Sequence, residues 1–168
     1  FHSDPSALLR SGKADLMIGS ERPSGKNFAS FPLFRFEIMA VLPPKHRLQA
    51  RRRLTAQDFE GETLITYPVQ RDRLDVFTAF LDPAGVTPKA VRTAELTPMM
   101  VQLVASGRGV TTLPNWALAE YLEHGLVASV RLGEEGIWRT LYAAVRREDA
   151  NKAYVQAFVQ LAQKTSFA

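Results

Sequence analysis

The sequence predicts an α/β fold with largely parallel sheets that helices cover on both faces. Apolar, β-branched runs of the length of buried strands alternate with amphipathic helical segments along the whole chain. Of the 168 residues, 46% are hydrophobic and 23% are charged, as in soluble globular proteins. This length suits one domain or two small lobes, with enough apolar material for a sizeable core.

The expected elements follow from these runs and from the breakers between them. Strands are expected at 14–20, 34–43, 63–69, 90–95, 109–114, 126–132 and 137–146. Helices are expected after Asp4-Pro5, over 71–85, from Thr97-Pro98 to about Ser106, over 116–125 and over 151–164. Pro43-Pro44 stops the longest strand, and the spacing of Thr55 and Asp58 predicts a small capping box.

The composition excludes several classes of site. Without any Cys, the chain has no disulfide, no thiolate metal site and no cysteine nucleophile. His2, His46 and His124 have no metal-ligand spacing, and no Ser stands in a nucleophile elbow, so we expect no metal, no cofactor and no catalysis. The basic runs at 45–47 and 51–53 lack interleaved aromatics, which favours a solvated loop rim over a nucleic-acid surface. No apolar run is long enough for a membrane span, and FHSDPSALL lacks the pattern of a signal peptide.

Ligands of open α/β sheets bind beyond the carboxyl ends of strands, which draws attention to TLITYPVQRDRLDVF at 63–77. Here a helix begins directly after the end of a strand. The backbone N–H groups at the start of this helix, Gln70 and the Arg71 guanidinium are therefore candidates for binding a carboxylate. Pro68 ends the strand. The alternative for Arg71 is a solvated side chain or an ion pair with Asp75. Tyr67 is either a pocket wall or a side chain packed in the sheet with its hydroxyl bonded internally.

Two further strand-to-helix turns contribute candidate residues. Thr97 is expected to be an ordinary helix cap, a ligand contact, or both. After Pro114, Asn115 is expected to cap the next helix, and Trp116 either lines the pocket or lies on a surface. The neighbouring Met99 and Met100 are better explained as helix core or a dimer face than as thioether contacts.

Several segments together resemble one family. They are ADLMIGS, FRFEIMAVLP, PPKHRLQA and VQLVASGRGVTTLPNWALAEYLEHGLVASVRL, and the last is the most specific. Together they resemble the effector-binding domain of LysR-type transcriptional regulators, over essentially all 168 residues. TYPVQRDRLDVFTAFLDPAG and WRTLYAAVR are similar, more narrowly, to the homocysteine-responsive regulators of methionine biosynthesis in this family.

The resemblance implies a type 2 periplasmic-binding-protein-like fold, in which two Rossmann-like lobes are joined by two crossing strands. Lobe one would comprise residues 1–36 and 145–168 and lobe two residues 43–140, with crossings near 36–43 and 140–146. The first strand and helix of lobe one and the family's winged helix-turn-helix would lie outside this sequence. The family pattern adds Leu113, Pro114 and Asn115 as ligand contacts of lobe two. Ser20, at a strand end, is their partner from lobe one, and an ordinary loop serine is the alternative.

The function implied is sensing, without catalysis. A homocysteine-like sulfur amino acid would bind between the lobes of a cytoplasmic, homodimeric or higher oligomeric regulator, which contacts DNA only through its other domain and no membrane. In the antiparallel dimer of the family, the helix faces around Leu8 and from Met99 to Val104 are candidates for the interface, with core packing as the competing explanation. The alternative function is a transport-type solute-binding protein for a small amino acid or anion.

Overall fold

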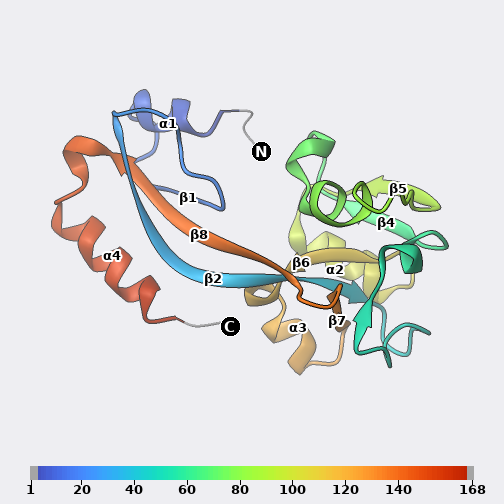
Figure 1. Ribbon diagram of the computed structural model, residues 1–168. Helices are drawn as coiled ribbons and strands as arrows, with labels where there is room; N and C mark the ends of the chain where they lie inside the picture. Colours follow the sequence, from blue (N-terminus) through green and yellow to red (C-terminus); the bar gives the residue numbers. More distant parts are fainter. Residues whose placement is uncertain (1–3, 166–168) are drawn as a thin grey trace. The chain divides into compact units, whose positions relative to one another are not determined.

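Two long strands carry the chain between two structural units in the computed structural model, which describes residues 4–165 (Figure 1). The strand β2 (Phe28–Leu42) leaves the first unit after Phe36, and β8 (Ile137–Arg146) returns to it at Trp138. Unit 1 therefore consists of residues up to 36 and from 138, whereas unit 2 is the continuous segment Glu37–Ile137. Within residues 4–165, no helix combines the length and the apolar character needed to cross a bilayer.

Unit 1 is a small sheet with a helix on each face. Its strand order is β1 (Met17–Gly19), β8, β2, and β1 runs antiparallel to β8 with Ile18 opposite Ala143. Because successive strand residues point to opposite faces, neighbouring residues of β8 serve two different core clusters. Ala143 and Val145 pack with Val155 and Val159 of α4 (Ala153–Gln163). Ala144 faces the other way and packs with Leu9 of α1 (Ser6–Arg10).

Unit 2 contains the remaining strands. β2 pairs antiparallel with β6 (Thr111–Pro114) and with β7 (Ala128–Leu132), and β3 (Arg53–Leu54) lies parallel to β7. A second, two-stranded sheet pairs β4 (Thr63–Thr66) in parallel with β5 (Ala90–Thr93). The predicted α/β class therefore holds, but the expectation of largely parallel sheets is wrong for the larger sheet, since β1, β2, β6, β7 and β8 all take part in antiparallel pairs.

The core of unit 2 forms around α2 (Thr97–Ala105). Met100, Val101 and Val104 are spaced to share one face of this helix, and all three are fully buried. They pack against the following core residues: Val41, Ile65, Leu113, Leu118 and Val127. Core packing therefore explains these helix residues, including Met100, whereas Met99 on the opposite face is 54% exposed.

The segment after β4 departs from the expected single helix over 71–85. It forms a 3-10 turn, Arg71–Arg73, followed by a π-helix, Val76–Leu81, which buries Val76, Phe77 and Leu81. The strand before it ends at Thr66, so Tyr67 lies in the connection rather than in the strand. The wider π-helical turn changes which residues share a face, which a 3.6-residue period does not predict.

The other elements lie close to their predicted positions. The strand expected over 34–43 begins earlier, at Phe28, although Pro32 lies within it and cannot donate to a strand ladder. The capping box of Thr55 and Asp58 is confirmed: the Thr55 backbone N–H donates to Asp58 Oδ2 at 2.8 Å. The helix expected over 116–125 is divided into a 3-10 turn, Asn115–Ala117, and the short helix α3 (Ala119–Glu123).

Candidate functional site

A cavity of about 510 Å³ lies within unit 2, where the connection after β4, the start of α2 and the start of α3 come together. Four of the residues proposed from the sequence line it: Tyr67, Thr97, Pro114 and Trp116. We refer to this cavity as the unit 2 pocket. Its remaining lining residues are Pro98, Ala117, Ala119, Glu120 and Tyr121.

Tyr67 and Thr97 form one polar feature of this pocket. Their hydroxyl oxygens lie 2.5 Å apart in a hydrogen bond, which joins the connection after β4 to the first turn of α2. Leu96, not Thr97, is the residue that precedes the helix, so the alternative of Thr97 as a helix cap is wrong. Tyr67 is half-buried and also packs against the core around α2. Both alternatives for Tyr67 therefore hold, since one side chain lines the pocket and is packed and hydrogen-bonded internally.

Two residues next to the pocket serve the fold. Leu113 is 1% exposed and belongs to the core, so its side chain is not presented to a ligand in this structure. Asn115 accepts a hydrogen bond from the backbone N–H of Glu37 at 3.3 Å. The expectation that Asn115 caps the following helix is wrong, because α3 begins only at Ala119 and is preceded by Leu118.

Gln70 and Arg71 are not among the described residues that line the unit 2 pocket, and neither is Pro68. The Arg71 guanidinium donates to the carboxylate of Asp82 and lies 3.8 Å from the centroid of the Phe77 ring. Arg71 therefore forms an ion pair with Asp82 and a cation–π contact with Phe77. The i,i+4 spacing to Asp75 suggested neither contact. Ser20 belongs to unit 1, where it follows β1 and is exposed.

The pocket contains two residues that the sequence analysis missed and that carry much of its chemistry. Glu120 and Tyr121 lie in α3, and Ala117 and Ala119 leave space beside the larger side chains. The pattern WALAEYLEHG does contain the signal: Ala117 and Ala119 stand between Trp116 and the pair Glu120-Tyr121, shortly after a strand end. The surface of the pocket is thus largely aromatic and aliphatic, with a few polar groups, as is typical of small-molecule sites.

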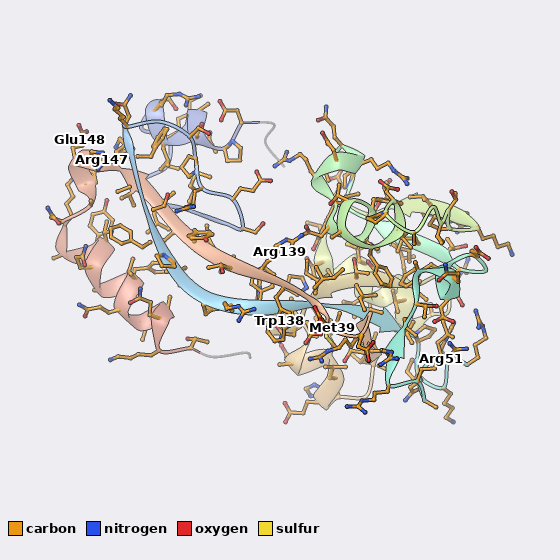
Figure 2. All side chains as sticks on the ribbon, viewed as in Figure 1. Met39, Arg51, Trp138, Arg139, Arg147 and Glu148 are labelled. Carbon is orange, nitrogen blue, oxygen red and sulfur yellow. The ribbon has the colours of Figure 1, made fainter. Side chains whose placement is uncertain are left out.

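Two other cavities have several basic residues in their linings. In unit 1, a cavity of about 330 Å³ is lined in part by Arg147 and Glu148. These two residues follow β8 and are labelled in Figure 2. The Arg147 guanidinium donates to the carbonyl oxygens of Lys26 and Phe28. In unit 2, a cavity of about 350 Å³ is lined by Arg52, Arg53, Arg131 and Glu134.

The basic runs of unit 2 are largely neutralised by acids. Arg53 pairs with Glu134 at 2.8 Å and Arg51 with Asp58 at 3.0 Å, while His46 and Arg47 both reach Glu62. This arrangement agrees with the interpretation of a solvated loop rim. Among residues 4–165, no three His, Asp or Glu side chains come together as a metal site would require, and His2 lies outside the described residues.

Comparison with known proteins places these features in a family. The model of the family described as "LysR substrate binding domain" matches residues 2–166. The HTH-type transcriptional regulator MetR of Haemophilus influenzae is 41% identical over 167 residues, which cover 99% of this chain and 54% of that protein. MetR of Escherichia coli strain K12 is 39% identical over 160 residues, 95% of this chain and 50% of that protein. The chain therefore spans about half the length of the curated relatives it matches.

Solved structures agree with the sequence comparison. The regulatory domain of MetR, a LysR family regulator from N. meningitidis, superposes with a TM-score of 0.81 at 41% identity, covering 96% of this chain and 74% of that one. The reduced OxyR regulatory domain from Pseudomonas aeruginosa has a TM-score of 0.78 at 20% identity over 95% of this chain and 77% of that one, which shows a shared fold alone. The predicted fold class, α/β of the type 2 periplasmic-binding-protein-like kind, is confirmed.

Proposed function

Because the chain belongs to the family of LysR substrate binding domains and is similar to MetR regulators, we propose that it senses a homocysteine-like sulfur amino acid and controls methionine-biosynthesis genes. The observation that carries this proposal is the similarity to MetR proteins at about 40% identity over nearly the whole chain. The relatives are named as transcriptional regulators, which supports a regulatory rather than a catalytic role.

We place the effector in the unit 2 pocket. Its volume of about 510 Å³ suits a small ligand, and its aromatic and alanine lining suits the apolar chain of a sulfur amino acid. Of the residues proposed from the sequence, we retain Tyr67, Thr97, Pro114 and Trp116 as ligand contacts, and we assign Arg71, Leu113 and Asn115 to the fold.

In the complete regulator, effector binding would shift an equilibrium between states that present the DNA-binding domains differently to two half-sites. The size of this shift is set by the difference between the effector's affinities for the states.

We propose a cytoplasmic homodimer whose DNA contacts come from a domain outside this chain. The exposed side chains of Leu96 and Met99 at the start of α2 are our candidates for part of the subunit contact. Sedimentation of Met99→Glu against the unmodified protein tests this assignment, and equal association would remove it.

Calorimetric titration with homocysteine tests the proposed effector, with methionine and alanine titrated for comparison. We expect heat and an increase in melting temperature at millimolar homocysteine or below, a larger effect than with alanine. No heat and no stabilisation at that concentration would exclude homocysteine as the effector of this domain.

A transport-type solute-binding protein is the alternative of the same fold. Coding sequence upstream distinguishes the two: about 90 residues with a helix-turn-helix pattern would indicate a regulator, and a signal peptide a transport protein.

A further inference from the structure

We infer that the unit 2 pocket recognises its ligand by a cationic nitrogen, with Glu120 as the residue that determines this specificity. The inference rests on the proposed function, in that it concerns the same pocket, and it goes further by naming the end of the ligand that enters. It reverses the expectation drawn from Gln70 and Arg71, which pointed to recognition of a carboxylate.

The described lining of the unit 2 pocket contains an acidic residue and no basic one. Among the described lining residues, Glu120 is the one acidic residue, and none is Lys, Arg or His. A ligand carboxylate would meet repulsion from Glu120 and find no cationic side chain in the lining to offset it. An ammonium group would instead form a charge-assisted hydrogen bond with the Glu120 carboxylate.

The lining of the pocket is also rich in aromatic residues. Of the nine described residues that line the pocket, three are aromatic: Tyr67, Trp116 and Tyr121. The negative face of an aromatic ring attracts ammonium groups, most strongly in the case of Trp. Trp116 is 40% exposed, so part of its indole surface is open to an incoming ligand. Aromatic rings together with a carboxylate form a combination that binds organic cations.

The neutral polar groups of the pocket agree with this assignment. The Tyr67 and Thr97 hydroxyls are hydrogen-bonded to each other, so part of their capacity to bind a ligand is already used. Arg71, the cation that the sequence placed near this turn, is held by Asp82 and Phe77.

Glu120 also contributes to the helix itself, because a carboxylate in the first turn of α3 interacts favourably with the helix dipole. Glu123 provides the control: like Glu120 it lies in α3 and is exposed, but it is not among the described residues that line the pocket. A loss of ligand affinity specific to Glu120→Gln therefore reports on the pocket, while equal losses in both variants would report on α3.

Three thiols of similar chain length distinguish recognition of the ammonium group from recognition of the carboxylate. Homocysteine has both charged groups, 3-aminopropane-1-thiol keeps the ammonium and lacks the carboxylate, and 4-mercaptobutanoate keeps the carboxylate and lacks the ammonium. Binding is measured from tryptophan emission in a Trp138→Phe variant, which leaves Trp116 as the reporter because the chain has two Trp residues. Calorimetry on the unmodified chain repeats each titration, so the test does not depend on that variant.

We expect 3-aminopropane-1-thiol to bind and 4-mercaptobutanoate to bind several-fold more weakly, because Glu120 attracts the ammonium and repels the carboxylate, and a pair with an exposed carboxylate is worth up to about 1 kcal/mol. Glu120→Gln should weaken binding of the amine by a similar factor, whereas Glu123→Gln should leave it unchanged. The inference is overturned if the amine fails to bind, if 4-mercaptobutanoate binds as tightly, or if the two Gln variants behave alike. Failure of homocysteine alone, with the amine still bound through Glu120, would instead contradict the proposed effector.

Discussion

Glu37 and Arg131 form a two-pronged ion pair within unit 2. Arg131 Nε lies 2.7 Å from Glu37 Oε1, and Arg131 Nη2 lies 3.1 Å from Glu37 Oε2. Glu37 is 5% exposed, while the Arg131 side chain is 42% exposed. The hydrogen bond to Glu37, reinforced by its charge, raises the pKa of Arg131 above its ordinary value. The pair joins β2 to β7 at the point where β2 enters unit 2.

Replacement of Arg131 should therefore destabilise the protein. Arg131→Met leaves the Glu37 carboxylate buried without its cation, and we expect thermal unfolding at pH 7 to shift down by several degrees. In the double variant Glu37→Leu/Arg131→Met the buried charge is also gone, so much of the loss should be recovered. Equal melting temperatures for the single and double variants would contradict this account.

Gly109 should tolerate no side chain. A Cβ atom at this position would lie 2.6 Å from the carbonyl oxygen of Thr63 and 3.1 Å from Ile65 Cδ1, because the chain passes close to β4 there. We expect Gly109→Ala to lower the free energy of unfolding by about 1–3 kcal/mol, as overpacking does. Gly61→Ala is the matched control, since its nearest neighbour in the structure is a flexible Arg47 side-chain atom at 3.8 Å. Denaturant titration of the two variants measures the difference.

Arg71 should matter modestly for stability and not for ligand binding. Its ion pair with Asp82 lies at the surface, where such pairs contribute less than about 1 kcal/mol, and its contact with Phe77 adds a similar amount. We expect Arg71→Ala to lower the melting temperature slightly and to leave the affinity for homocysteine unchanged in calorimetry. A large loss of affinity with unchanged stability would return Arg71 to the ligand site. Asp82→Asn serves as the control for the ion pair alone.

Stability in acid should depend on Asp149. This carboxylate is 3% exposed and lies 2.6 Å from Lys152 Nζ and 2.8 Å from Arg146 Nε. The hydrogen bond from Lys152 is the main cause that holds the pKa of Asp149 below its ordinary value of 3.8, against the opposing effect of burial. A lowered folded-state pKa means that the stabilisation is present above about pH 3.8 and is lost as the pH falls through the lower folded-state value.

Asp149→Asn tests this dependence. Near neutral pH the variant should be less stable than the unmodified protein, since the ionised carboxylate is lost. As the pH falls below about 3.8, the two melting temperatures should converge. A difference that stays constant from pH 7 to pH 2 would show that the carboxylate charge contributes nothing.

The order of elements could be predicted from the sequence because it depends on local patterns. Period-2 and period-3.6 runs, with Pro and Gly at their ends, place most strands and helices within a few residues, and the strand Ile137–Arg146 matches its prediction at both ends. Strand direction could not be predicted this way. Local alternation does not tell whether a neighbour runs parallel or antiparallel, and β2 joins two antiparallel partners.

The sequence by itself determined the α/β class and pointed to the three turns that contain Tyr67, Thr97, Pro114 and Trp116, because apolar periodicity and turn residues act over a few positions. Only the tertiary structure decided the charge of the pocket that these residues line. The π-helical segment after Tyr67 holds Arg71 against Phe77 and Asp82, while α3 brings Glu120 and Tyr121 to the pocket. The direction of a long side chain depends on neighbours distant in sequence, and here those neighbours engage the predicted cation and present a carboxylate to the pocket.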